Sequence, residues 1–279
     1  MAQNVNNPSA ESSEDLFVDS ADLAASDSDT RVEPVAEEES LLQKERKLRD
    51  NLSRYLVAIS LALCFYTFVL DHIQVLNKVF ASASYVTTIL TTLLTLGMVF
   101  LIFKSGYPLD EFGITLKRWQ YSVKESILFT LPILLFILLV KWIAIKTVPA
   151  FHQVLLFNLH GAVVNDSYDD AVHAHVVWLQ TLLLYTFLIA PFQELAARGG
   201  LQAALSMFLT TKHRSWIAIL VTSLIFSTTH LAYPIHIAIL SFVGGIFWGW
   251  LFHRQKNLIG VSISHAMIGL WVFWFLGIS

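Results

Sequence analysis

The polar residues best suited to chemistry occur together in one stretch, Pro191 to Gln202, which reads Pro-Phe-Gln-Glu-Leu-Ala-Ala-Arg-Gly-Gly-Leu-Gln. Glu194 and Arg198 lie within a long apolar region, where ionisable side chains are costly and commonly mark a functional site. Because they are four residues apart, they share one face of a helix, with the acid N-terminal to the base as pairing prefers. Gln193 places a neutral amide beside them. The stretch predicts a catalytic centre or a buried ion pair.

Two histidines in later apolar segments are the other candidates. Phe226 and His230 are four residues apart and therefore share a helix face. His265 is followed at the same spacing by Gly269. A single histidine in a membrane span is most often a packed, hydrogen-bonded side chain. Two of them near one glutamate, however, can activate a water for hydrolysis. We therefore predict that both histidines act with Glu194.

A metal site at Glu194, His230 and His265 is the alternative use of the same side chains, since carboxylate and imidazole are zinc ligands. The sequence has no His-Glu-x-x-His motif, so a metalloprotease helix of that kind is not supported. Cys64 is the only cysteine, which excludes an internal disulfide and a cysteine-based zinc site. We expect no cofactor and keep a divalent metal at these three residues as the less favoured alternative.

The elements that position these residues are predicted to be transmembrane helices. Of the 279 residues, 55% are hydrophobic and only 14% are charged, whereas charged residues make up about 25% of a soluble protein. The composition excludes an ordinary soluble protein and predicts an all-α, polytopic membrane protein. Apolar segments near the ~20 residues that cross a bilayer predict about seven spans, at 55–73, 83–103, 122–146, 175–192, 216–232, 235–252 and 258–277.

Two local features modify this pattern of spans. Pro191 predicts a break or kink, so that the segment 192–209 would lie partly in the membrane interface. Gly245 and Gly249 form a pair of small residues one helical turn apart, which predicts close packing against a neighbouring helix.

Charge patterning predicts the orientation in the membrane. The basic residues flank alternate connections between the predicted spans, as cytoplasmic loops do; they are Lys44, Arg46, Lys47, Arg49, Arg54, Lys104, Lys117, Arg118, Lys124, Lys212, Arg214, Arg254 and Lys256. This distribution predicts a cytoplasmic N-terminus and an external C-terminus. We expect an integral membrane protein of a bacterial inner (plasma) membrane, with the lipid bilayer as its surroundings and no nucleic-acid partner.

The chain is predicted to have four segments. Residues 1–40 are rich in Ser, Asp, Glu and Ala and contain one base, Arg31; such a segment buries too little apolar surface to order itself, which predicts a disordered acidic tail in the cytoplasm. Residues 41–54 form a basic juxtamembrane helix. Residues 55–172 hold the N-terminal spans and an external loop, and residues 173–277 form the membrane domain that carries the polar motifs.

Three short motifs in the last segment resemble those of the CPBP (Abi) family. They are Gln193-Glu194-x-x-x-Arg198, Phe226-x-x-x-His230 and His265-x-x-x-Gly269. The family, which includes Ras-converting CAAX endopeptidases and bacterial bacteriocin-processing and self-immunity proteins, carries Glu-Glu-x-x-x-Arg, Phe-x-x-x-His and His-x-x-x-Asn on three helices of a polytopic bundle. The order and spacing agree over about residues 175–275.

The resemblance implies intramembrane proteolysis of a membrane-associated peptide or protein. In eukaryotic members this is removal of the three residues after a prenylated cysteine. It assigns water activation to the positions of Gln193 and His230, and oxyanion stabilisation to those of His265 and Gly269. The chain departs from the family at two of these four positions. An amide replaces the working glutamate at Gln193, and Gly269 has no side chain to donate a hydrogen bond.

Both departures affect the expected rate. Loss of a general base costs about 100- to 10,000-fold, and loss of an oxyanion donor costs about 100- to 1,000-fold. Gln193 can still position a water while Glu194 or His230 takes its proton, and Ser262 or Ser264 can supply a hydroxyl. Arg198 and Phe226 are then the framework of the site.

Three hypotheses follow from the sequence. The first is an active intramembrane endopeptidase of the CPBP type that uses Glu194, His230, His265 and Gln193. The second is an impaired family member that serves as a membrane binding, immunity or scaffold protein, and it rests on the substitutions at Gln193 and Gly269. The third, less favoured, is a small transporter in which the buried acid and the histidines relay protons.

Overall fold

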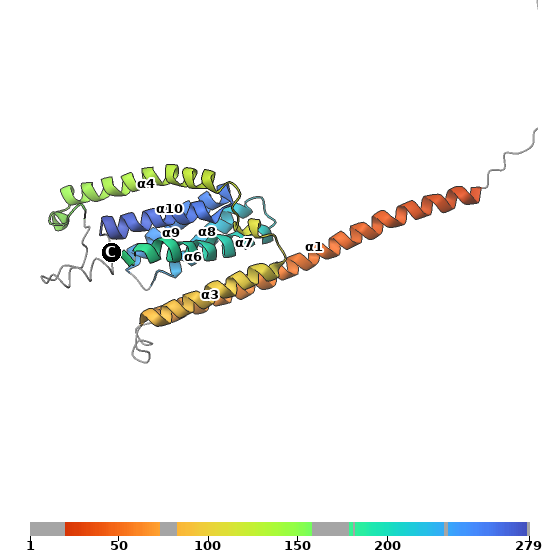
Figure 1. Ribbon diagram of the computed structural model, residues 1–279, viewed down its shortest axis with the longest axis horizontal. Helices are drawn as coiled ribbons and strands as arrows, with labels where there is room; N and C mark the ends of the chain where they lie inside the picture. The colour runs from red at the N-terminus through yellow and green to blue at the C-terminus, as the bar shows by residue number, and fades with distance from the viewer. Residues whose placement is uncertain (1–19, 73–82, 158–178, 181, 232–233, 278–279) are drawn as a thin grey trace, which may run out of the picture. The chain divides into compact units, whose positions relative to one another are not determined.

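The computed structural model describes residues 20–72, 83–157, 179–180, 182–231 and 234–277 (Figure 1). All regular elements in these ranges are helical, which confirms the predicted all-α class. The chain divides into two compact units, Met1–Lys47 and Leu48–Ser279. The second unit contains the polar motifs.

The first described helix, α1 (Ser20–Asp71), begins inside the segment that the composition predicts to be disordered. Residues 20–40 contain the strong helix formers alanine and glutamate, but also nearly as many serines and aspartates and Pro34, so their composition does not explain the helix. Residues 1–19 lie outside the described residues. The boundaries of the four predicted segments stay a prediction.

Among the described residues, six of the seven predicted spans coincide with apolar helices, and the remaining span, 175–192, lies partly outside these residues. Three helical stretches are long and apolar enough to cross a membrane, namely Glu37–Leu70 of α1, α4 (Trp119–Thr147) and α9 (Ile235–Gln255). Three shorter apolar stretches are Ile89–Ser105 of α3 (Ala83–Ser105), α8 (Arg214–Thr228) and Leu258–Phe273, which covers α10 (Leu258–Gly269) and most of η5 (Leu270–Phe275). The chain is a polytopic helical membrane protein, as predicted.

The segment that contains Pro191 is continuously helical. It consists of two π-helical and two α-helical stretches in succession, η3 (Tyr185–Ile189), α6 (Ala190–Glu194), η4 (Leu195–Gln202) and α7 (Ala203–Phe208). The expected break at Pro191 is wrong, because the residues just before it keep helical backbone angles. Proline has no N–H to donate, and here it stands where the wider π-turns give way to α-helix. Such π-stretches are frequent at functional sites.

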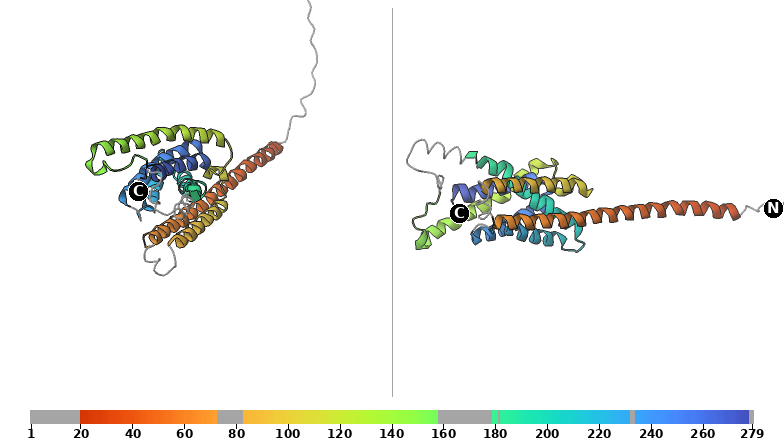
Figure 2. Two further views of the ribbon diagram at one scale, coloured as in Figure 1. Left: turned by 60° about the vertical axis from the view of Figure 1, so that its left-hand side comes forward. Right: turned by 90° about the horizontal axis from the view of Figure 1, so that it is seen from below.

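Helix α10 has the central place in the packing of this unit. It contacts α4, α6 and α9, and α8 in turn packs along α9 (Figures 1 and 2). Gly245 and Gly249 of α9 allow a close approach to α8, since a Cβ atom on either would lie about 3 Å from Ser223 or Ile219. The structure confirms the close packing predicted for this glycine pair.

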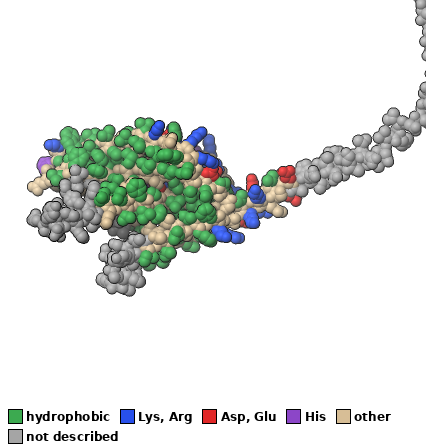
Figure 3. All heavy atoms as spheres, viewed as in Figure 1, with side chains coloured by type: hydrophobic (Ala, Val, Ile, Leu, Met, Phe, Trp, Pro, Cys, Tyr) green, Lys and Arg blue, Asp and Glu red, His purple; other side chains and the backbone are tan. Residues whose placement is uncertain are grey.

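The outer surface of the bundle is apolar. Large hydrophobic side chains such as Leu128, Leu135 and Phe136 of α4 are mostly exposed, and Figure 3 shows hydrophobic side chains over much of the visible face. A helix of a soluble protein would turn its apolar face to a core. Exposure along α4 is instead what a lipid-facing helix requires.

The connections at one end of the bundle are joined by hydrogen bonds. Asn257 caps α10 by accepting a hydrogen bond from the Ile259 N–H at 2.9 Å, and its amide donates to the carbonyls of Thr115 and Lys117 at 3.0 and 3.2 Å. These two carbonyls follow η1 (Leu109–Phe112). The connection before α4 and the connection before α10 are therefore side by side. The remaining short element, η2 (Pro149–Phe151), follows the other end of α4.

Candidate active site

Glu194 is the centre of a buried polar cluster. Its Oε2 atom accepts a hydrogen bond from Arg198 Nε at 3.1 Å, and its Oε1 atom accepts one from His265 Nδ1 at 2.6 Å. Glu194 and Arg198 are 0% exposed and His265 is 5% exposed. The structure thus brings three of the predicted residues together across two helical segments. Charged groups that are removed from water in this way must be paired, and here each is.

Hydrogen bonds link the ion pair to a further polar residue on the same helix face. Arg198 Nη1 lies 3.4 Å from Gln202 Oε1, and Gln202 Nε2 donates to the carbonyl of Gly249 in α9 at 2.8 Å. Sequence reasoning did not assign a role to Gln202. The sequence does indicate that Gln202 belongs with the pair, because Glu194, Arg198 and Gln202 are each four residues apart and so share one helix face.

The His265 imidazole is held between aromatic rings. The Trp248 ring stacks on it with centroids 4.0 Å apart and planes 18° apart, and the Phe226 ring approaches it edge-on at 5.9 Å. Trp248 was not predicted, and nothing in its sequence surroundings marks it. Because Nδ1 faces a carboxylate, this nitrogen carries the proton and donates. A neutral ring then has its lone pair on Nε2, the atom that can take a proton.

His230 also packs against Phe226. Its Nδ1 atom is 2.9 Å from the Phe226 carbonyl oxygen, and the two rings are 4.8 Å apart. A carbonyl can only accept, so Nδ1 donates and a neutral His230 also has its lone pair on Nε2. The Arg198 guanidinium lies 5.7 Å from the same Phe226 ring. Phe226 is therefore the common packing surface for both histidines and the ion pair.

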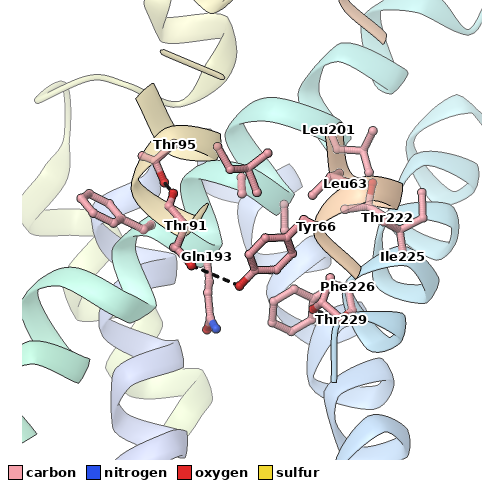
Figure 4. A pocket seen from close by; sticks show the side chains of 14 residues that line it. Leu63, Tyr66, Thr91, Thr95, Gln193, Leu201, Thr222, Ile225, Phe226 and Thr229 are labelled. Carbon is pink, nitrogen blue, oxygen red and sulfur yellow. Dashed lines mark hydrogen bonds between the residues drawn. The ribbon is translucent and has the colours of Figure 1, made fainter. Parts of the chain in front are cut away.

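Gln193 lines a mostly apolar pocket beside the cluster. The lining residues come from α1, α3, α6, η4 and α8 and from Thr229, which follows α8; they are Leu63, Tyr66, Thr91, Leu94, Thr95, Phe192, Gln193, Ala196, Ala197, Leu201, Thr222, Ile225, Phe226 and Thr229. Figure 4 shows the Gln193 side chain extended beside Tyr66, with Phe226 and Thr229 across from it. Gln193 and Phe226 thus belong to the pocket wall while their neighbours form the buried cluster.

Ser264, one of the two serines expected to compensate for the missing side chain of Gly269, is engaged elsewhere, while a role of Ser262 stays a prediction. The Ser264 hydroxyl pairs with Thr130 of α4 at 2.7 Å and is fully buried. Close to Gly269 there is instead a tyrosine, since a Cβ atom on this glycine would be 2.5 Å from Tyr185 Cζ. Tyr185 belongs to η3, and its contact with α10 could not be deduced from spacing along the chain.

The described residues offer no further metal ligands beside Glu194, His230 and His265. Within the described ranges no group of three or more His, Cys, Asp or Glu side chains is arranged to hold an ion. His265 Nδ1 and both Glu194 oxygens are engaged with protein partners. The absence of a cofactor stays a prediction.

Comparison with known proteins identifies the segment that carries the site. Residues 175–271 match the family described as type II CAAX prenyl endopeptidase Rce1-like. No curated protein and no solved structure matches the chain. The matched segment contains all three polar motifs and both helical segments that meet at Glu194. The resemblance to the CPBP family that the motifs predict is therefore confirmed.

Proposed function

Taking the Rce1-like character of residues 175–271 as the premise, we propose that the protein is an intramembrane endopeptidase of the CPBP type. The observation that carries this proposal is the Glu194–His265 hydrogen bond of 2.6 Å inside an apolar bundle. A buried carboxylate bonded to imidazole Nδ1 fixes the tautomer and the orientation of the ring, and it stabilises the imidazolium that forms when Nε2 accepts a proton. This arrangement supports His265 as the general base, in place of the oxyanion role that the family resemblance implies for this position.

The proposed reaction is hydrolysis of a peptide bond by water. Nε2 of His265 takes a proton from the water, and the hydroxide forms a bond to the carbonyl carbon of the substrate. The carbonyl electron pair moves to oxygen and gives a tetrahedral oxyanion. When the intermediate collapses, the carbon–nitrogen bond breaks and the leaving amine takes the proton from the His265 imidazolium. The net reaction consumes one water and releases an acid and an amine.

Gln193 and His230 are proposed to position this water. The Gln193 amide cannot take a proton at neutral pH, but it can donate and accept hydrogen bonds. A lone pair on His230 Nε2 can accept a hydrogen of the same water. Arg198 holds the Glu194 side chain in place through the bond at 3.1 Å.

The substrate is proposed to be a membrane-associated peptide or protein that enters by the pocket at Gln193. The wall of this pocket is formed mainly by leucine, alanine, phenylalanine and threonine side chains. An apolar segment fits such a wall because it can replace lipid contacts without losing hydrogen bonds to water.

The orientation in the membrane is proposed to follow the basic connections. Asn257 joins the connection that bears Lys117 and Arg118 to the connection that bears Lys256, so basic residues from both connections are at the same end of the bundle. Cytoplasmic loops carry such an excess, which supports a cytoplasmic N-terminus.

Cleavage by the purified protein tests the proposed function. In detergent or liposomes, the wild type should cleave members of a panel of membrane-associated peptides, including prenylated ones. His265→Asn and His230→Ala should each lose at least about 100-fold in turnover, as expected for general acid–base groups. Full activity in both variants would contradict the proposal, provided that thermal unfolding shows them to be folded.

A second candidate function, binding without turnover, is favoured by the substitutions at Gln193 and Gly269. It predicts that the wild type binds a membrane peptide with an affinity that Glu194→Ala lowers, while no product forms. Turnover by the wild type that depends on His265 would exclude it.

A further inference from the structure

Gly269 leaves a space that another residue fills. An ideal Cβ atom on this glycine would overlap the Tyr185 hydroxyl oxygen and would lie 2.5 and 2.6 Å from Tyr185 Cζ and Cε1. These separations are far below the ~3.5–4.0 Å at which non-bonded carbon atoms pack. The phenol of Tyr185 therefore occupies the volume from which any side chain at 269 would extend. The Tyr185 phenol can occupy this position only because residue 269 has no side chain.

The same phenol lies beside the proposed general base. Gly269 follows His265 by four residues in α10, so both face the same side of the helix. The Tyr185 and His265 rings meet edge-to-face with centroids 6.2 Å apart and planes 80° apart. His265 is in turn bonded to Glu194. Tyr185 thus packs on this face of α10, against both the His265 ring and Gly269.

We propose that the Tyr185 hydroxyl donates the hydrogen bond that stabilises the oxyanion, in place of a donor on residue 269. This assignment rests on the proposed function. When hydroxide adds to the carbonyl carbon, the negative charge develops on the carbonyl oxygen, and the Tyr185 O–H donates to it while keeping its proton. Tyrosine hydroxyls serve in this way in other acyl-transfer sites. The collapse of the intermediate returns the electron pair and releases the hydrogen bond.

Tyr185→Phe tests the donor directly, because it keeps the ring and removes only the hydroxyl. We expect kcat for peptide cleavage to fall about 100- to 1,000-fold with KM little changed, as for loss of one oxyanion donor. Tyr121→Phe is the matched control, since Tyr121 is an exposed residue near the start of α4 whose hydroxyl donates to Glu125 outside the candidate site, and it should keep the wild-type rate.

The outcomes of this test separate the two proposals. A wild type that cleaves, together with a Tyr185→Phe variant of unchanged kcat, overturns the role of Tyr185 and leaves the proposed function standing. A wild type that cleaves no peptide in the panel overturns the proposed function and the role of Tyr185 with it.

A donor swap distinguishes hydrogen bonding from space filling. Gly269→Asn alone should lose activity because its side chain collides with Tyr185. Tyr185→Ala should also lose activity, whereas Tyr185→Ala combined with Gly269→Asn should recover at least ~10-fold over Tyr185→Ala, because the amide is a new donor in the vacated space. Tyr185→Ala with Gly269→Leu fills that space without a donor and should recover nothing. Equal recovery by the Asn and Leu combinations would overturn the proposal.

Discussion

At the scale of single residues, Glu194 makes two hydrogen bonds, one with each of its carboxylate oxygens. One oxygen pairs with Arg198 and the other orients His265. Because all three side chains are buried, removal of any one leaves a charged or polar group without its partner. A substitution at any of these three residues can therefore change both the stability of the fold and the cleavage rate. Each variant must be compared with the wild type by its unfolding and by its cleavage activity.

The first prediction concerns the buried ion pair between Glu194 and Arg198. Glu194→Ala should lower the free energy of unfolding by about 3–5 kcal/mol, since it leaves the Arg198 guanidinium buried without a counter-charge. The double variant Glu194→Ala/Arg198→Met should be less destabilised, because the unpaired charge is gone. Denaturant unfolding in detergent measures both. An equal loss in the single and double variants would show that the ion pair contributes nothing beyond packing.

The second prediction concerns Gln193. If His265 is the base, a carboxylate at 193 is not needed, and Gln193→Glu should raise kcat by less than about tenfold, far below the 100- to 10,000-fold that a general base contributes. Initial rates on the best peptide of the panel measure this. A gain of two orders of magnitude or more would mean that the wild-type site lacks its base.

The sequence predicted part of the site, and the limit has a physical reason. The Glu194–Arg198 pair follows from spacing within one helix, where four residues fix a shared face. The bond between Glu194 and His265 joins residues far apart in the chain, and its existence depends on how α6 and α10 are set against each other. Trp248 and Tyr185 were missed for the same reason, since a single aromatic residue in an apolar span carries no signal of its neighbour.

At the scale of elements, the helices approach closely at glycines. Gly249 is where α9 meets η4 and α8, for a Cβ there would lie 2.9 Å from both Gln202 Oε1 and Ile219 Cγ2. The hydrogen bond from Gln202 to the Gly249 carbonyl depends on this approach. Gly249 thus helps to hold Gln202, the last of the three polar residues Glu194, Arg198 and Gln202 that contact one another along this helix.

The third prediction uses two glycines in different surroundings. Gly249→Ala should lower the unfolding temperature and reduce cleavage, because α9 must move away from Gln202 and Ile219. Gly97→Ala in α3 is the control, since a Cβ there meets no atom within 4 Å and alanine favours a helix by about 1 kcal/mol over glycine. Gly97→Ala should therefore be as stable as the wild type or more so. Equal unfolding temperatures for both variants would refute the role of Gly249.

Helix positions were the most predictable feature of the elements, because ~20 apolar residues in a row have few alternatives to a span. Pro191 shows where such reasoning fails. A proline predicts a break in a helix, yet here the helix continues through Pro191 and has π-helical turns just before α6. The choice between breaking and widening a turn is made by packing against other helices, which a local pattern does not contain.

At the scale of the whole molecule, one end of the membrane unit carries paired basic residues. Lys117, which pairs with Asp110 at 2.9 Å, and Arg254, which pairs with Glu125 at 2.6 Å, flank the connections next to α4 and α10. The 3₁₀-helix η1 beside them also packs against α7, so the connection from α7 to α8 is near the same end. The exposed surface between the ends is apolar.

The fourth prediction is that this basic end faces the cytoplasm. In a Cys64→Ser background, Leu116→Cys and Thr211→Cys should resist a membrane-impermeant thiol reagent added outside intact cells and react after permeabilisation. Val154→Cys, which lies beyond the other end of α4, should react in intact cells. The opposite labelling pattern would invert the proposed orientation without affecting the site.

A double-mutant cycle on the cleavage rate tests whether Glu194 and His265 act as one catalytic unit. Residues that act together give non-additive losses. We predict that Glu194→Gln, His265→Asn and their combination reduce kcat/KM to nearly the same level in folded protein. Losses that multiply in the combined variant would show independent roles and contradict the account.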